Sequence, residues 1–199
     1  MRLYLGTMMW VIAILQTAFV AVLVPAYWWQ YRPQNFLWMS DVALFGSTIA
    51  LWWPNRLLVS VEAVSVLVLE IIWGIDILLK LALGEKFLGL SKYMFQREIP
   101  LWIRLVSLFH IWLPWLLLWQ VMQTGYDPRA LVMQTVVWWV VVPACYFIST
   151  PQENINFVYG VGQLQKRLTP VGYLIVLLLF VPLCVYVPTH FFLGWIARR

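Results

Sequence analysis

The stretch LLVSVEAVSVLVLEIIWGIDILL, residues 57–79, decides the fold of this chain. It is long and apolar enough to cross a bilayer as a helix, since a span needs about 20 mostly apolar residues. It nevertheless contains three acidic residues, Glu62, Glu70 and Asp76. A carboxylate in hydrocarbon is costly, so such residues usually face the interior of a helix bundle and mark a functional site. The stretch therefore predicts a membrane helix inside a bundle with a polar interior.

The composition of the whole chain agrees with a membrane protein. Hydrophobic residues make up 63% of the 199 residues, charged residues only 11%, and there are fourteen Trp. The mean hydropathy is +0.83. A soluble domain is about 45–50% apolar. The predicted spans are approximately 5–29, 36–53, 57–79, 99–119, 129–148 and 170–195. We therefore expect an all-α fold, a single integral membrane domain (1–199) formed by six transmembrane helices, with no soluble domain.

Six spans place both termini on one side, which we call side A, together with the connections around Pro54 and Asp127. The other connections then lie on side B. Trp residues cluster near both expected interfaces, as in an aromatic belt. Side B holds more Lys and Arg than side A, which favours side B as the cytoplasmic side. The net charge of +5 suits anionic headgroups and requires no nucleic-acid partner.

The two cysteines and the known sequence motifs point to no cofactor or metal. Cys145 lies near the end of the fifth span and Cys184 well inside the sixth, so their depths differ too much for a disulfide. No Cys/His cluster suggests a metal ligand set. The GxSxG, HExxH, GxGxxG and P-loop patterns are absent from the sequence, which removes support for standard hydrolases, metalloproteases and nucleotide-binding proteins.

Depth along the spans predicts a first candidate site near side B. Asp41, Asp76 and Arg104 each lie within about five residues of that side and so share a level. The polar loop after the fifth span opens on the same side, and we expect it to cover the site as a substrate-binding segment. Its polar residues are Glu153, Asn154 and Asn156. The alternative is a structural ion pair that fixes the register of the helices.

A second candidate site is predicted near the middle of the membrane. Glu70, His110 and Thr48 lie at similar depth. A hydroxyl, an imidazole and a carboxylate are the parts of a nucleophile, a base and the group that orients the base. The alternative is that Thr48 bonds its own backbone and that His110 and Glu70 form a buried pair. The same pair would also suit a proton relay.

A third group of polar residues lies near side A. Glu62 is five residues into the third span, and His190 follows Pro182 and Pro188 in the sixth. Prolines inside this span, and Pro114 and Pro143 in the fourth and fifth, predict kinks. Broken helices can line a cavity, so Glu62 and His190 are further candidates for substrate binding. Irregular packing is the alternative.

Several strings resemble those of known membrane proteins. Phe36–Leu44 (FLWMSDVAL), Leu105–His110 (LVSLFH), Glu153–Asn156 (ENIN) and Pro188–His190 (PTH) resemble a group of bacterial polytopic proteins known only as membrane-associated proteins. This resemblance implies the same architecture over nearly the whole chain and no particular activity. In size, six spans and a Thr/His pair, the chain is also similar to the integral-membrane hydrolases of fatty acid esters of hydroxy fatty acids.

These observations predict a multi-pass protein of the bacterial inner membrane with one of three functions. The leading hypothesis is a lipid-active intramembrane enzyme, since acids, histidines and an arginine suit an amphiphilic substrate with a polar head. The alternatives are a small proton-coupled transporter or channel subunit, and a non-catalytic assembly partner. The expected partners are membrane lipids and either a second copy of the chain or another membrane protein.

Overall fold

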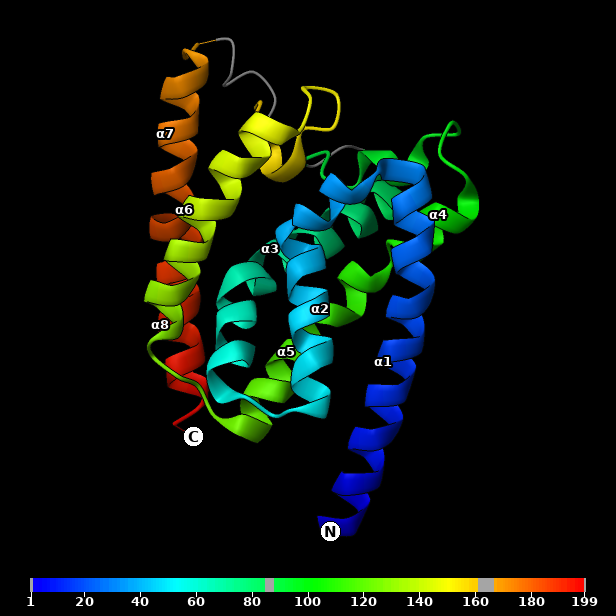
Figure 1. Cartoon of the computed structure of the whole chain (residues 1–199), viewed down its shortest axis with the longest axis vertical. Helices are drawn as coiled ribbons and strands as arrows, with labels where there is room; N and C mark the ends of the chain where they lie inside the picture. Colours follow the sequence, from blue (N-terminus) through cyan, green and yellow to red (C-terminus); the bar gives the residue numbers. More distant parts are fainter. Residues whose placement is uncertain (1, 85–87, 161–166, 199) are drawn as a thin grey trace.

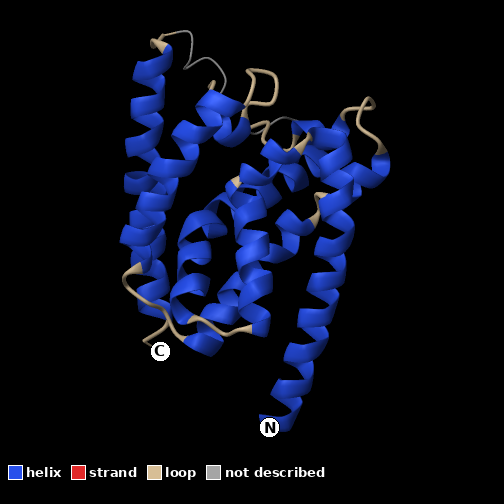
Figure 2. Ribbon diagram, viewed as in Figure 1, coloured by secondary structure: helices blue, strands red, loops and turns tan. Residues whose placement is uncertain are grey.

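The computed structural model describes residues 2–84, 88–160 and 167–198. Within these ranges the chain is built from helices and their connections and contains no β-strand (Figure 2). The helices run side by side as a bundle, with the start of the first and the end of the last at the same end of the molecule (Figure 1). The prediction of an all-α fold is therefore confirmed.

Helical segments occupy all six positions at which the sequence predicts a span. The first three are α1 (Arg2–Tyr31), α2 (Met39–Trp52) and α3 (Arg56–Leu83). The fourth is divided into α4 (Leu101–Val106) and α5 (Phe109–Thr124), and the fifth is α6 (Ala130–Ile148). The sixth consists of α7 (Pro170–Val181), the π-helical segment η5 (Pro182–Tyr186) and α8 (Val187–Ile196). Short 3₁₀ helices lie in the connections: η1 (Pro33–Leu37), η2 (Lys92–Phe95) and η3 (Ile155–Phe157).

Four helical segments are long and apolar enough to cross a membrane: Gly6–Tyr31, Leu101–Thr124, Ala130–Ile148 and Pro170–Ile196. Helix α2 is apolar but has only 14 residues. At 1.5 Å per residue it is about 21 Å long, shorter than the roughly 30 Å of a hydrocarbon core. Helix α3 is not among the four segments. The crossing of the membrane by all six segments, α2 and α3 among them, therefore stays a prediction.

Helix α3 forms the centre of the bundle, and the apolar faces of the other helices point outward. It packs most extensively against α5, and then against α2 and α6. Five of its apolar residues, Val59, Ala63, Val64, Val66 and Leu67, are at most 1% exposed. By contrast, Leu15 of α1, Val140 of α6 and Phe180 of α7 are more than half exposed. Large apolar side chains outside and polar ones inside are the distribution expected of a protein surrounded by lipid.

The helix ends follow from local chemistry. The Asn55 side chain accepts a hydrogen bond from the backbone N–H of Leu58 (3.0 Å) at the start of α3, and Thr169 accepts one from Gly172 (3.1 Å) at the start of α7. Such caps satisfy backbone donors that have no partner within the helix. Helix α3 ends at Gly84, whose positive φ of 70° suits a residue without a Cβ.

The prolines disturb the helices at one clear place. Pro182 has no N–H to donate to the carbonyl of Leu178, and the chain continues there as the π-helical segment η5. The indole Nε1 of Trp139 in α6 donates to that carbonyl instead (3.0 Å) and so ties α6 to α7. Pro114 and Pro143 lie inside α5 and α6, and the division between α4 and α5 comes earlier, at 107–108. Kinks at these two prolines stay a prediction.

The two cysteines are not bonded to each other. Cys145 in α6 is buried and Cys184 in η5 is exposed, and both are free thiols. This agrees with the difference in depth that the sequence predicts.

Candidate functional site

The contact predicted between Glu70 and His110 is present. The Nδ1 atom of His110, in α5, lies 2.6 Å from the Oε2 atom of Glu70, in α3. The two side chains are 15% and 5% exposed. The His110 ring also packs against two aromatic rings, with centroid distances of 4.2 Å to Phe109 and 4.7 Å to Trp73. The carboxylate and the rings together fix the orientation of the imidazole, which is what an acid or base group requires.

A second buried carboxyl group lies next to this pair. Asp41 is 2% exposed, and its carboxyl group interacts electrostatically with that of Glu70. It belongs to the first turn of α2, where the helix dipole favours a negative charge. Asn35 donates a hydrogen bond to its Oδ2 atom (3.4 Å), whereas the buried Oδ1 atom has no hydrogen-bond partner in the described part of the chain.

Two tyrosines and a serine complete the surroundings of these carboxyl groups. The hydroxyl oxygens of Tyr27 and Ser107 are 2.6 Å apart, and Tyr93 also hydrogen-bonds to Ser107. Both tyrosines interact electrostatically with Asp41. Burial raises the pKa of Tyr93, so its phenol is a neutral hydrogen-bond donor at physiological pH. We call the whole cluster the Glu70–His110 centre; its members are Tyr27, Asp41, Glu70, Trp73, Tyr93, Ser107 and His110.

Sequence reasoning missed Tyr27, Trp73, Tyr93 and Ser107. Tyr and Trp near the ends of spans are typical of the membrane interface. A tyrosine whose hydroxyl points inward therefore cannot be distinguished by sequence from one that lies at the interface. Tyr93 lies in η2, between the third and fourth spans, where counting depth along a span gives no position. Ser107 precedes His110 by three residues, the spacing of neighbours on one helix face, and this signal could have identified it.

Thr48 does not belong to the centre. Its hydroxyl donates to the carbonyl of Leu44 in its own helix (2.7 Å). Thr48 therefore does not supply the nucleophile of the predicted nucleophile, base and carboxylate group. The alternative, a hydrogen bond from Thr48 to the backbone of its own helix, is the correct one.

The ionic cluster predicted for Asp41, Asp76 and Arg104 is wrong. Arg104 donates to the backbone carbonyl of Met94 (3.0 Å), and its Nε atom is buried without a partner in the described residues. The Asp76 carboxylate instead accepts hydrogen bonds from the backbone of the following loop and from the Ser91 hydroxyl (2.7 Å). Equal depth does not imply that two side chains point toward each other, and here all three find separate partners.

The polar loop after α6 is held by its own side chains and by the start of α2. Asn156 accepts from the backbone N–H of Met39 (3.1 Å) and donates to the carbonyl of Leu37 (2.8 Å). Asn154 bonds within the loop, to Gly160 and Tyr159. The residues proposed as a cover for the site thus attach the loop to the helix that bears Asp41. Their part in substrate binding stays a prediction.

The Glu153 carboxylate of this loop accepts three hydrogen bonds: from Gln34 (2.7 Å), from the backbone N–H of Thr150 (2.7 Å) and from the Thr150 hydroxyl (3.0 Å). Burial alone would raise the pKa of Glu153, but these hydrogen bonds and the nearby Arg32 lower it below its ordinary value. Glu153 is therefore an ionised carboxylate that links the loop to the connection between α1 and α2.

At the other end of the bundle, His190 contacts an aromatic hydroxyl. Its Nδ1 atom lies 2.6 Å from the hydroxyl oxygen of Tyr126. Burial raises the pKa of Tyr126 to about 12, with a further contribution from Asp127. The Arg56 guanidinium donates to the backbone carbonyl of Tyr126. The sequence placed His190 and Glu62 together near side A, but among the described residues His190 bonds to Tyr126, and the Oε2 atom of Glu62 has no hydrogen-bond partner.

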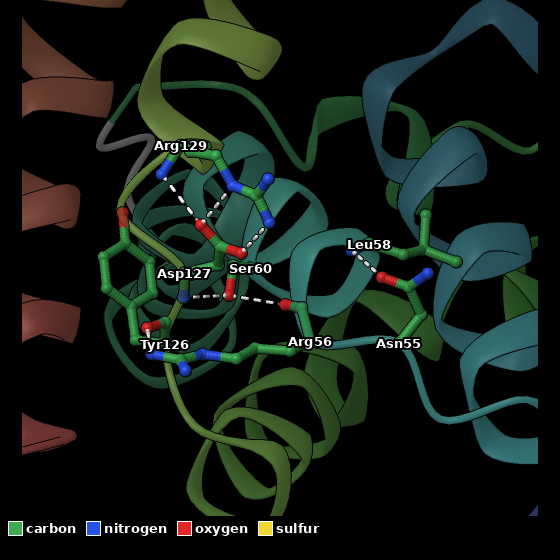
Figure 3. A network of polar contacts seen from close by, with 7 residues as sticks. All are labelled: Asn55, Arg56, Leu58, Ser60, Tyr126, Asp127 and Arg129. Atoms are coloured by element: carbon green, nitrogen blue, oxygen red, sulfur yellow. Dashed lines mark hydrogen bonds and ion pairs between the residues drawn. The ribbon is translucent and has the colours of Figure 1, made fainter.

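Figure 3 shows the turn that follows Tyr126 and how it is fixed to α3. The backbone N–H of Asp127 donates to the Ser60 hydroxyl (2.9 Å), which in turn donates to the carbonyl of Arg56 (2.7 Å). The Arg129 side chain donates to both carboxylate oxygens of Asp127 (3.1 and 2.8 Å). These bonds, together with the backbone N–H of Arg129, lower the pKa of Asp127 to about 2.

Neither of the two described pockets borders His110. One, of about 60 Å³, lies where α3 meets the loop after it; Asp76, Lys80, Gly89, Ser91, Lys92 and Phe95 line it. The other, of about 230 Å³, is an apolar groove between α6 and the α7–η5 segment. In the described part of the chain, no three His, Cys, Asp or Glu side chains are grouped so that they could hold a metal ion.

The Glu70–His110 centre has the parts of an acid–base group: the Glu70 carboxyl group contacts one nitrogen of the imidazole, as in sites where a carboxylate orients a histidine. No known protein family, no curated protein and no solved structure matches this chain.

Proposed function

We propose that this protein is a multi-pass protein of the bacterial inner membrane and that the Glu70–His110 centre binds and releases protons, as in a small proton channel or proton-coupled transporter. The observation that carries the proposal is the 2.6 Å contact between His110 and Glu70, buried between helices whose outer faces are apolar. Ionisable groups inside a membrane bundle are rare and commonly form proton relays.

The composition of the centre supports this function over one that needs a bound substrate. Asp41, Glu70 and His110 share the centre with the hydroxyl groups of Tyr27, Tyr93 and Ser107. All of these groups can gain or lose a proton or pass a hydrogen bond along. The rings of Trp73 and Phe109 pack against the imidazole, and neither described pocket borders it, which favours transfer of a proton over binding of a large substrate.

Proton flux into liposomes tests the proposal. The purified protein is reconstituted with a pH-sensitive dye inside the vesicles, and a pH gradient is applied with a potassium ionophore present to prevent charge build-up. The parent should dissipate the gradient faster than protein-free liposomes. His110→Gln and Glu70→Gln should reduce the rate to that of the protein-free vesicles. Glu98→Gln, the same chemical change at an exposed residue, should leave the rate unchanged. A parent no faster than empty vesicles would contradict the proposal.

We also propose, as a second candidate, a lipid-active enzyme in which His110 activates water. The observation in its favour is that Glu70 orients the imidazole as the carboxylate orients the base in a catalytic triad. The Thr48 and Ser107 hydroxyls are both hydrogen-bonded elsewhere, so water is the nucleophile in this scheme.

The test is to incubate the protein with esterified lipids in mixed micelles and to measure released fatty acid by mass spectrometry. His110→Gln should lower the rate by about 100-fold or more if the imidazole is the general base. Glu98→Gln again serves as the control. An equal rate for the parent and His110→Gln would exclude this scheme.

A further inference from the structure

Glu62 is a buried carboxyl group that lies away from the Glu70–His110 centre. It precedes Glu70 by eight residues in α3, a rise of about 12 Å along the helix. The residue is 5% exposed. Between the two carboxyl groups, α3 contributes the buried apolar residues Val66 and Leu67.

Among the described residues, no cation forms an ion pair with Glu62. Its Oε2 atom is buried and has no hydrogen-bond partner among the described residues, and neither of the two ion pairs found there involves it. Two buried amide side chains, those of Gln134 and Gln120, donate to groups other than Glu62. Gln134 donates to Ser65 (2.9 Å), one turn along α3, and Gln120 donates to the backbone carbonyl of Ser47 (2.9 Å) in α2.

The carboxyl group also sits in very close contact with α2. It packs directly on Gly46, and a Cβ added at that position would overlap the Glu62 carboxyl group. The ionisable group found to interact with Glu62 is Tyr186 of η5, whose hydroxyl is already bonded to Gln134 (3.1 Å). Tyr186 carries no positive charge in either of its protonation states. Glu62 is therefore buried against the backbone of Gly46 and near a neutral phenol, with no cation paired to it among the described residues.

An ionised carboxylate in such a place would lose its hydration without gaining a partner, and a buried group in that position takes up a proton instead. We propose that Glu62 is a second proton-binding site: its carboxylic acid carries a proton in the folded protein at neutral pH. The neutral acid is the form that can lie buried against Gly46 without a cation beside it. The inference goes beyond the proposed function and does not rest on it.

Infrared difference spectroscopy tests the protonation state directly. Spectra of the parent and of Glu62→Gln are recorded at neutral pH in bilayers and subtracted. The C=O stretching band of a protonated carboxylic acid should be present in the parent and lost in the variant. Glu153→Gln is the matched control, because Glu153 is an ionised carboxylate and its loss should remove carboxylate bands instead. Loss of carboxylate bands in Glu62→Gln would overturn the inference.

A second measurement on the unsubstituted protein covers the case in which Glu62→Gln does not fold. A hydrophobic carbodiimide reacts with a protonated carboxyl group: the acid O–H adds across a C=N bond, and no other reactant or leaving group is needed. Mass spectrometry of the digested protein should place one adduct on Glu62 and none on Glu153. A peptide containing Glu62 that stays unmodified would then count against the proposal. Because this assay reads labelling and not flux, its result is independent of whether Glu70 and His110 conduct protons.

Discussion

At the scale of single residues, Asp76 anchors the chain that follows α3. Its carboxylate accepts hydrogen bonds from the backbone N–H groups of Leu88 (2.7 Å), Gly89 (3.0 Å) and Ser91 (2.8 Å) and from the Ser91 hydroxyl. Gly89 has a φ of 78°, a conformation that suits glycine and turns its N–H toward the carboxylate. The Asp76 carboxylate thus serves as the hydrogen-bond acceptor for three backbone N–H groups of the loop, which have no helical carbonyl to bond to.

The Asp76→Ala variant should therefore be strongly destabilised. Buried donors that lose their acceptor cost on the order of 1–3 kcal/mol each, and charged acceptors cost more than neutral ones. The midpoint of thermal unfolding in detergent should fall by about 5 °C or more, since 1 kcal/mol corresponds to about 2–4 °C in a chain of this size. Arg104→Ala removes a hydrogen bond to one carbonyl and should lower it less. The reverse order would mean that Arg104, and not the loop, is the partner of Asp76.

Asp127 provides a prediction of pH dependence outside the spans. Its pKa is lowered to about 2 by Arg129, from about 3.9 in an unfolded chain. A depressed folded-state pKa stabilises the protein above the unfolded value, and this contribution disappears as the pH falls through the folded value. The difference in unfolding midpoint between the parent and Asp127→Asn should thus be constant above about pH 5 and shrink toward pH 2. A difference that is the same at both ends of this range would show that the carboxylate charge is not involved.

The contacts of single residues could be predicted only in part from the sequence. The pairing of Glu70 with His110 followed from equal depth and opposite character, and it is present. The same reasoning failed for Arg104 because a count along a helix gives height and leaves the direction of the side chain undetermined. It also could not see that backbone N–H groups of a loop would compete for Asp76. Backbone N–H donors are present in every loop, so the types of residue in a loop do not indicate which of these donors will bond to a carboxylate.

At the scale of the elements, the contact between α2 and α3 depends on a glycine. Gly46 lies against the Glu62 carboxyl group, whereas no atom lies within 4 Å of the place where a Cβ would extend from Gly74 in α3. The two glycines therefore form a matched pair: both are helical, and one faces a neighbour while the other faces open space. Substituting alanine at each glycine therefore distinguishes the effect of helix propensity on stability, at position 74, from the effect of packing, at position 46.

Gly46→Ala and Gly74→Ala should change the stability in opposite directions. The added methyl group at position 46 must displace Glu62, which is 5% exposed and has no solvent to enter, so a loss of about 1–3 kcal/mol is expected from overpacking. At position 74 the better helix propensity of alanine should give a gain of up to about 1 kcal/mol. Thermal unfolding in detergent measures both. Equal stabilisation by the two substitutions would show that Glu62 does not pack tightly on α2.

The starts of the helices could be predicted from the sequence more accurately than the irregularities inside the spans. Pro170 begins α7 and a cap at Asn55 precedes α3, and both signals can be read directly. The division of the fourth span at 107–108 has no proline or glycine to indicate it. Pro114, where the sequence predicts a break, lies inside α5, and a kink there stays a prediction. A helix can accommodate a proline when neighbouring groups satisfy the freed carbonyl, and the sequence alone does not show those neighbours.

At the scale of the whole molecule, the bundle has polar groups in its interior and apolar groups on its surface. Helix α3 carries Glu62, Glu70 and Asp76 and is enclosed by helices whose outer faces are apolar. The connections alternate between the two ends of the bundle along the chain (Figure 1). This alternation agrees with the order of sides A and B that the spans predict. The number of crossings nevertheless depends on α2, which is shorter than a hydrocarbon core.

Reporter fusions distinguish a six-span protein from one in which α2 only enters the membrane. If α2 and α3 both cross, the connection at Pro54 lies on the side opposite to Arg32, and successive fusions alternate. Suitable fusion points are Arg32, Pro54, Ser91, Asp127 and Gln152. A short helix can cross when the bilayer thins around it or when flanking side chains reach the interface, at a cost of a fraction of a kcal/mol per Å. The exposed Trp53 at the end of α2 is suited to such an interface. We therefore expect alternation at all five points, whereas equal signals from the fusions at Arg32 and Pro54 would show that α2 returns to the side from which it entered.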